Sequence, residues 1–183
     1  MKLKLKDVFI DENESIYPVK RKLDSKIGGG GKGLLLLRID IGVKQLSPYH
    51  WFLDDEKKLP LDLAIHSEKG IINYIKFFFI KDKISNEKPI EIDSISHELD
   101  GVPIFDISIY NDRLYQVFEK GEVLSSYIDN NLYLLIKGMN IETSVKIDSK
   151  TSFLFDKENF FGGLVIKSLM EAEIDELKIA NLL

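Results

Sequence analysis

The side chains of this sequence that could do chemistry are three histidines and several clusters of carboxylates, because the 183 residues include no cysteine. No two of the histidines, His50, His66 and His97, lie within fifteen residues of each other. Zinc sites use three or four ligands with close pairs such as H-x-x-x-H, so this spacing gives no metal-binding motif. We therefore predict no bound metal and no cofactor.

Paired carboxylates could supply acid–base catalysis, and Glu91 with Asp93 is a pair whose spacing suits it. On a strand the two side chains would share a face, where mutual repulsion raises the pKa of one of them. The same alternation is typical of the solvent-facing side of an antiparallel sheet. The sequence also lacks a G-x-S-x-G motif and a cysteine nucleophile, so we predict a protein without catalytic residues.

A run of glycines from Gly28 to Gly31, followed by Lys32 and Gly33, is the one low-complexity segment of the sequence. Gly28, Gly30 and Gly33 match the dinucleotide-binding spacing G-x-G-x-x-G, but that motif joins a strand to a helix, whereas here a predicted strand follows. The P-loop spacing G-x-x-x-x-G-K-[ST] fails at both ends. We expect no nucleotide there. A flexible loop and a close approach of a partner's backbone remain as interpretations.

Aromatic and acidic residues that follow Pro48 form the predicted partner-binding site. We expect this segment to be irregular, and aromatic side chains on a loop are frequent anchors in protein interfaces. The only tryptophan of a chain is as often buried packing. The predicted site residues are Tyr49, Trp51, Asp54, Asp55 and Glu56. The alternative is a small-ligand or catalytic pocket formed by Tyr49, Trp51, His66 and nearby carboxylates.

Short apolar alternations separated by polar turns predict the elements that would position these residues. Three predicted hairpins pair residues 61–65 with 71–79, 105–110 with 114–118, and 151–155 with 160–166. Residues 34–41 are apolar enough for a central strand buried on both faces. Residues 90–95 predict a short strand, and a turn at 129–131 joins two more. The predicted fold class is α+β, a predominantly antiparallel, hairpin-built sheet or sandwich with a C-terminal helix.

The C-terminal helix is predicted to extend at least from Met170 to Leu177. Ser168 and Glu171 have the S-x-x-E spacing of a capping box. Acidic residues follow in the first turn, where the helix dipole favours them, and apolar residues recur at helical spacing. We divide the chain into an N-terminal segment with the glycine-rich loop, residues 1–33, and a single β-rich domain that ends in this helix, residues 34–183.

The net charge differs between these two parts, since residues 1–33 carry +3 and residues 34–183 carry −8. An acidic domain repels phosphates, so we predict no direct binding of nucleic acid. The negative charge either serves solubility alone or attracts a basic protein partner. The sequence shows no signal peptide and no apolar run long enough to cross a bilayer, so we expect a cytoplasmic protein that does not bind membranes.

Residues 132–169 contain LYL at 132–134, SVKI at 144–147, FLFD at 153–156 and GLVI at 163–166. This region resembles a small bacterial β-sheet module of unknown function, with Lys146 in place of the usual acid and Asn159 where glycine is common. The whole chain, acidic, β-rich and abundant in lysine, isoleucine and asparagine, resembles immunity proteins paired with bacterial polymorphic or contact-dependent toxins.

The resemblance implies an inhibitor that binds a cognate toxin and does no chemistry, and no individual residue is carried over from it. The predicted function is therefore that of an immunity protein that neutralises a basic toxin, often a nuclease. The alternative is a small-ligand-binding or enzymatic β-barrel-like protein.

Overall fold

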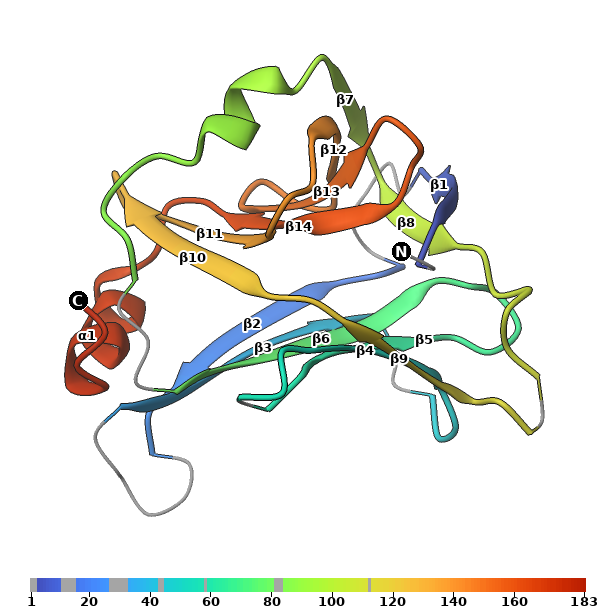
Figure 1. Cartoon of the computed structure of the whole chain (residues 1–183), viewed down its shortest axis with the longest axis horizontal. Helices are drawn as coiled ribbons and strands as arrows, with labels where there is room; N and C mark the ends of the chain where they lie inside the picture. The colour runs from blue at the N-terminus through green and yellow to red at the C-terminus, as the bar shows by residue number, and fades with distance from the viewer. Residues whose placement is uncertain are drawn as a thin grey trace.

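The computed structural model describes residues 3–10, 16–26, 33–42, 45–57, 59–80, 84–111 and 113–183, so the Gly28 to Gly31 run lies outside the described residues. Two β-sheets form two layers, with a two-stranded sheet at one side and a helix at the opposite side (Figure 1). Most strand pairs are antiparallel, and the helix lies at the C-terminal end. The predicted α+β, mainly antiparallel fold class is confirmed.

The first sheet is built from β2 (Val19–Asp24), β3 (Leu34–Ile41), β4 (Tyr49–Asp54), β5 (Leu61–Ile65), β6 (Ile72–Ile80) and β9 (Gln116–Lys120). Their order across the sheet is β2-β3-β6-β5-β4-β9, and only the edge strand β9 runs parallel to its neighbour. Burial alternates along β3, which corrects the prediction of burial on both faces. The reason is that one face of this sheet packs against the second sheet and the other face does not.

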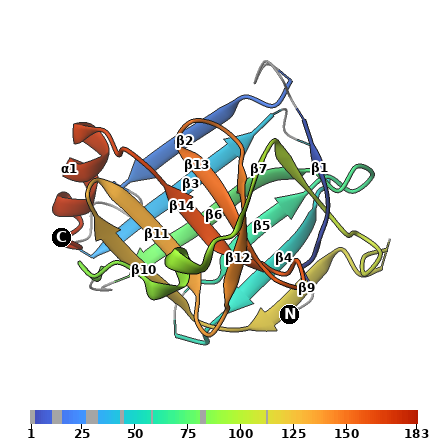
Figure 2. The same cartoon turned by 90° about the horizontal axis from the view of Figure 1, so that it is seen from above.

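The second sheet is built from β7 (His97–Asp100), β10 (Val123–Ile128), β11 (Asn131–Ile136), β12 (Ile141–Lys146), β13 (Thr151–Asp156) and β14 (Phe161–Ile166). Their order is β10-β11-β14-β13-β12-β7, with β7 parallel to β12. The strands of the two sheets run in different directions when the molecule is seen from above (Figure 2). The two-stranded sheet pairs β1 (Leu5–Phe9) with β8 (Val102–Phe105).

Two of the three predicted hairpins are confirmed, β5 with β6 and β13 with β14, and the predicted turn at 129–131 joins β10 to β11. Asp129 and Asn130 have φ of 51° and 61° in that turn, as a tight hairpin requires. The third hairpin is wrong, because β8 pairs with β1 and β9 pairs with β4. The turn between the two segments does form, because Asn111 and Leu114 exchange backbone hydrogen bonds of 3.1 and 3.0 Å. The strands on either side of this turn, however, belong to different sheets.

Two further predicted segments differ from the structure. Residues 49–52 are strand β4, not an irregular stretch, since they pair with β5 on one side and β9 on the other. Residues 90–94 form a 3-10 helix, η1 (Ile90–Ser94), not a strand. The Ser94 hydroxyl donates to the carbonyls of Glu91, at 2.8 Å, and Ile141, at 2.6 Å, and these bonds hold the tight turn against β12.

The core between the layers contains Phe161, whose ring contacts four other aromatic rings. Its neighbours are Trp51 of β4 in the first sheet, Phe105 of β8 in the small sheet, and Phe153 and Phe155 of β13, with ring centroids 5.9 to 6.4 Å apart. All five side chains are fully buried. One residue of β14 therefore joins all three sheets.

The edges of the two large sheets are joined by one stretch of chain. Strand β9 ends at Lys120 in the first sheet, and β10 begins three residues later, at Val123, in the second sheet (Figure 1). At the bend, the Gly121 N–H donates to the carbonyl of Asp54 at 3.1 Å, and the Lys137 N–H donates to the carbonyl of Glu122 at 2.9 Å. Each sheet therefore holds one side of the bend.

The helix α1 (Glu171–Ile179) contacts the opposite edge strand, β2. Arg21 of β2 forms two bonds, of 2.6 and 2.8 Å, with the Glu173 carboxylate, and both side chains are 9% exposed. The cap differs from the prediction: Ser168 has φ of 51° outside the helix, and Glu173 accepts from the Met170 N–H at 2.8 Å instead. None of the described helices is long and apolar enough to cross a membrane.

Two segments of the first 33 residues contribute strands to these sheets. Strand β1 pairs with β8, and β2 pairs with β3 along six residues. Strand β2 also carries Arg21, the partner of Glu173 in α1. Strand β2 and the C-terminal helix are thus held together at one edge of the first sheet.

Replacing Phe161 by alanine should lower the free energy of unfolding by about 3–5 kcal/mol, because the change leaves a cavity at the junction of three sheets. Phe118→Ala is the matched control, since its ring is 59% exposed and meets only Phe52 among aromatic rings of the described residues. We expect this control substitution to lower the free energy of unfolding by less than about 1.5 kcal/mol. Urea unfolding measures both values, and equal losses would contradict the central role of Phe161.

Replacing Glu173 by glutamine should destabilise the protein by about 3 kcal/mol at pH 7, because Arg21 would remain buried without a counter-charge. Burial opposes ionisation of Glu173, but the bonds from Arg21 and the Met170 N–H prevail and hold its pKa below the ordinary 4.5. The contribution of this carboxylate is therefore complete above pH 4.5 and is lost as pH falls through its lowered folded-state pKa. Unfolding measured from pH 7 to pH 2 should show the stability gap between wild type and variant narrowing below pH 4.5. Glu171→Gln, an exposed change in the same turn, should show no comparable gap.

Candidate protein-binding surface

Strand β4 places two of the predicted site residues on its inner side. Trp51 is 0% exposed, its Nε1–H donates to Glu119 at 2.5 Å, and its ring meets Phe161 edge-on. Trp51 is therefore core packing in this fold, and we correct its assignment as a surface anchor. Tyr49 lies at the strand's first position, half-buried, with its ring stacked on Tyr110 at 4.7 Å. Only Tyr49 of this pair is within reach of a partner.

The three predicted acidic residues lie at the end of β4 and in the turn that follows it. One oxygen of Asp54 accepts from the Glu56 N–H at 2.8 Å, and one oxygen of Asp55 accepts from the Lys57 N–H at 3.0 Å. These bonds fold the chain back on itself and leave Glu56 at φ of 63° with an exposed side chain. Glu56 pairs with Lys120 at 2.5 Å, an exposed contact that contributes little to stability. The turn is therefore negatively charged and accessible to a partner.

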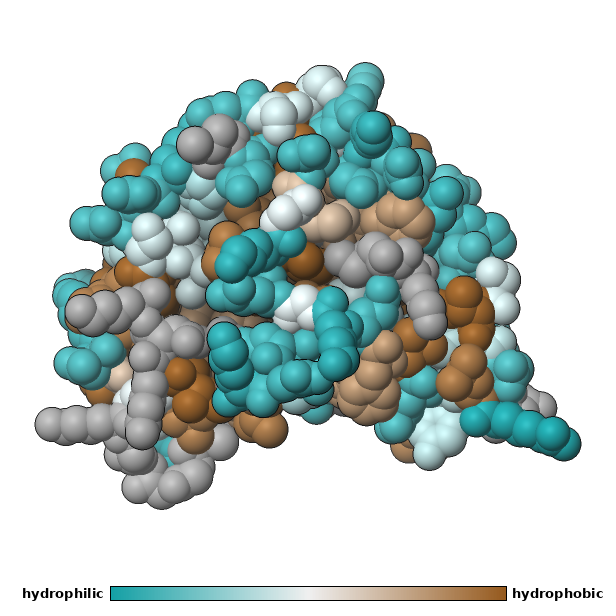
Figure 3. All heavy atoms as spheres, in the orientation of Figure 1, coloured by the Kyte–Doolittle hydropathy of each residue, from teal (hydrophilic) through white to brown (hydrophobic). Residues whose placement is uncertain are grey.

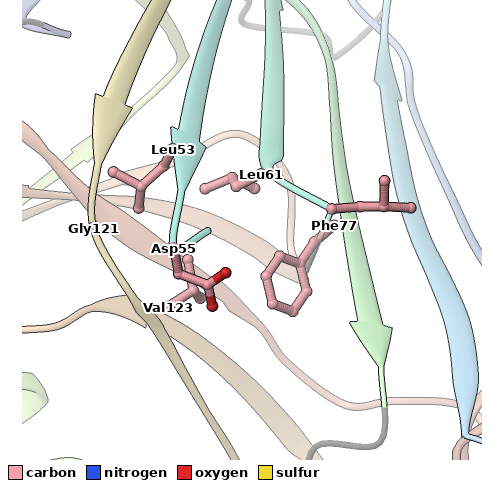
Figure 4. A pocket seen from close by; sticks show the side chains of 7 residues that line it. Leu53, Asp55, Leu61, Phe77, Gly121 and Val123 are labelled. Carbon is pink, nitrogen blue, oxygen red and sulfur yellow. The ribbon is translucent and has the colours of Figure 1, made fainter. Parts of the chain in front are cut away.

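Asp55 also lies beside a small apolar hollow where β4, β5 and β6 meet the bend between β9 and β10 (Figure 4). Leu53, Leu61, Phe77 and Val123 contribute apolar side chains around it. The volume of about 10 Å³ holds at most one water molecule. This hollow is therefore part of the packing of the turn and not a ligand pocket.

The outward side chains of β4 and β9 form a row of stacked rings that the sequence analysis did not identify. His50 stacks on Phe52 with ring centroids 5.5 Å apart, and Phe52 stacks on Phe118 at 4.6 Å. The register explains the row, because Phe52 is directly opposite Phe118 in the parallel pair. Phe118 is 59% exposed, which is unusual for a ring of this size on an edge strand.

A polar network continues this row across the outer face of the first sheet. Asp62 accepts from Tyr74 at 3.1 Å, lies 2.9 Å from His50 Nδ1, and lies 3.8 Å from Lys76 Nζ. Lys76 and Arg38 lie over the Tyr74 ring, 4.3 and 4.7 Å from its centroid. Burial, followed by the charge of Asp62, raises the pKa of Tyr74, so its hydroxyl remains a donor. The network holds these five side chains in one arrangement.

A surface hollow of about 530 Å³ lies at the start of β4 and β9. Its lining residues are Leu46, Ser47, Pro48, Tyr49, His50, Ser67, Asn111, Tyr115 and Gln116. Leu46 and Tyr115 are exposed there, and Leu114 beside them is exposed too. We name the surface from this hollow through Phe52 and Phe118 to the acidic turn the β4–β9 strip. Figure 3 shows hydrophobic and hydrophilic residues interspersed along the lower side of the molecule, where the first sheet lies.

The alternative pocket of Tyr49, Trp51, His66 and nearby carboxylates is only partly assembled. Tyr49 lines the hollow, but Trp51 points into the core. His66 Nδ1 accepts from the backbone N–H groups of Glu68 and Lys69, so this ring serves the β5–β6 turn. His97 is exposed, 3.8 Å from Glu142. Among the described residues, no group of three His, Asp or Glu side chains is arranged to hold a metal ion.

Sequence reasoning could have found part of the ring row. Alternation along residues 49–54 places His50 and Phe52 opposite Trp51 and Leu53, once the segment is assigned as a strand. Phe118 and Asp62 could not be found, because each joins the row through a strand partner that only the tertiary fold supplies.

No protein-family model matches the sequence, and no curated protein matches it.

Proposed function

We propose that this protein is a non-enzymatic inhibitor, an immunity protein that binds a basic bacterial toxin domain, often a nuclease, in the cytoplasm. The observation that carries the proposal is the β4–β9 strip, where exposed apolar and aromatic residues lie beside an acidic turn. Exposed apolar residues gathered in one place and rimmed by polar groups are typical of protein interfaces.

The strip supports binding because its rings are already ordered by neighbours. Phe118 stacks on Phe52, which stacks on His50. A partner that covers Phe118 therefore meets a side chain whose position is already set by its neighbours. Binding costs less when the contact residues are preorganised. A few aromatic anchors at the centre of an interface usually supply most of its free energy, and Phe118 and Tyr115 are the candidates here.

The acidic turn supports a basic partner. Asp54, Asp55, Glu56 and Glu122 outnumber Lys57 and Lys120 around a second hollow, of about 290 Å³, at this end of the strip. A nuclease must be basic to hold phosphates, so its surface and this turn attract each other over a distance set by the salt concentration. Charges at the rim of an interface chiefly set the association rate.

One observation favours the alternative of a small-ligand or catalytic site. His50 lines the 530 Å³ hollow, and Asp62 lies 2.9 Å from its Nδ1 atom, which orients the ring as a carboxylate orients a general base. Turnover of a small substrate that His50→Ala abolishes, with binding to the toxin domain unchanged, would favour this alternative.

The test is co-expression with the toxin domain encoded beside this protein, followed by purification of the complex. We expect cells to survive only when both proteins form a physical complex. Survival without any complex would contradict an inhibitor that acts by binding.

Replacing Phe118 by alanine should weaken the complex by more than about 1 kcal/mol, chiefly through faster dissociation, because the change removes an anchor and leaves the rim charges in place. Leu124→Ala on the neighbouring edge strand β10 is the matched control, because Leu124 is also exposed but lies outside the strip. We expect Leu124→Ala to change the binding free energy by no more than about 0.5 kcal/mol. Surface plasmon resonance gives both rates, and equal effects would remove the strip as the interface.

The association rate should fall steeply as salt rises from about 0.01 to 1 M, because screening shortens the reach of the acidic turn. Glu56→Lys should lower the association rate at low salt and flatten its salt dependence. Glu158→Lys, the same charge change on the β13–β14 turn, should alter the slope less. An association rate that does not depend on salt would contradict the electrostatic part of the proposal.

A further inference from the structure

Strand β7 is an open edge of the second sheet. It pairs with β12 alone, and all four of its residues are exposed. The Gly101 N–H, just after the strand, donates to the Lys146 carbonyl of β12 at 2.9 Å, and Asp100 lies opposite Lys146, so alternation along the strand directs the backbone groups of Glu98 and Asp100 away from β12. These two residues present unpaired N–H and C=O groups in the part of the chain that the structure describes.

The edges β2 and β10 are covered by other parts of the chain, whereas β7 and β9 are open among the described residues. The edge β2 is contacted by α1, and its Arg21 is bound to Glu173. The edge β10 is met by Ser85, whose N–H donates to Ser125 and whose carbonyl accepts from Tyr127, at 3.0 and 2.8 Å. An uncovered edge is a template for strand addition, and proteins usually cover, shorten or charge it unless it is used.

A hollow of about 640 Å³ lies beside β7, and β1, Ile10 and Asn159 contribute the rest of its lining. Leu99 of β7, 44% exposed, and Ile10 beyond β1, 69% exposed, are apolar side chains that face it with Val8. An extended segment added to β7 would place every second side chain on one face. Those side chains would cover Leu99 and Ile10, which no described element covers.

The charges around this hollow are mainly negative. Asp7, Glu98 and Asp100 line it together with one cation, Lys6. Asp100 lies 3.6 Å from Lys146, but both side chains are more than half exposed, so this contact neutralises little. A segment that alternates lysine or arginine with Val, Ile or Leu would therefore match both the charge and the apolar residues.

We propose that β7 is a docking edge for an extended basic segment of a partner protein, which adds to the second sheet as a further strand. This surface lies on the other layer from the β4–β9 strip, so the proposal does not depend on the proposed function (Figure 1).

The test uses a fluorescent peptide, KVKVKVK, and its acidic counterpart, EVEVEVE, with binding to the full-length protein followed by fluorescence anisotropy at low salt. We expect the basic peptide to bind at least tenfold more tightly. A basic peptide with alternate backbone nitrogens methylated should lose at least tenfold in affinity, because it keeps its charge but cannot pair with the strand edge. Equal binding of the methylated peptide would overturn strand addition.

Variants of the protein locate the site. Glu98→Pro removes a backbone donor on the open side together with the charge and should weaken peptide binding at least tenfold, whereas Glu98→Gln loses the same charge, keeps that donor and should weaken binding less than threefold. Glu98→Lys should weaken binding, and Glu68→Lys, the same charge change on the exposed β5–β6 turn, should not. Phe118→Ala should leave peptide binding unchanged, which separates this site from the strip. Equal losses from Glu98→Lys and Glu68→Lys would show non-specific attraction and overturn the proposal.

Discussion

The packing of Phe161 between the layers is the contact on which the rest of the structure depends. Its ring meets Trp51 from the first sheet and Phe105 from the small sheet, so three sheets share one buried centre. The residues that follow it allow this position, because Gly163 has φ of 144° and a Cβ there would lie 2.2 Å from the carbonyl oxygen of Leu134. Strand β14 can therefore approach β11 only without a side chain at that point.

This core contact also determines which side chains of β4 and β9 face solvent. Once Trp51 points inward to Phe161, the alternation of β4 directs His50 and Phe52 outward. Strand β9 then adds Phe118 to the same face, because its parallel register places it opposite Phe52. The β4–β9 strip is thus built on the outer side of the strand whose inner side fills the core.

Both proposed contact surfaces lie at sheet edges, and the fold treats its edges unequally. The edge at β2 is covered by α1 through the buried pair of Arg21 and Glu173, while β7 and β9 are not covered by a described element. Covering an edge protects it from unwanted pairing, and leaving one open offers backbone groups or flat rings to a partner. The helix therefore closes one edge of the first sheet, and both proposed contact surfaces lie at edges without such a cover.

The sequence by itself determined the class of fold, two of the three predicted hairpins and the C-terminal helix, because alternation and turn residues act between neighbours in the chain. Asp129 and Asn130 already specify a tight turn, for instance. Only the tertiary structure decided that residues 49–54 are a strand and that β9 pairs with β4 in parallel. Pairing between distant segments depends on how whole layers pack, and the sequence of a short apolar segment does not specify which strand it pairs with. For that reason Tyr49 and the acidic turn could be named from the sequence, whereas Phe118, Asp62 and the burial of Trp51 could not.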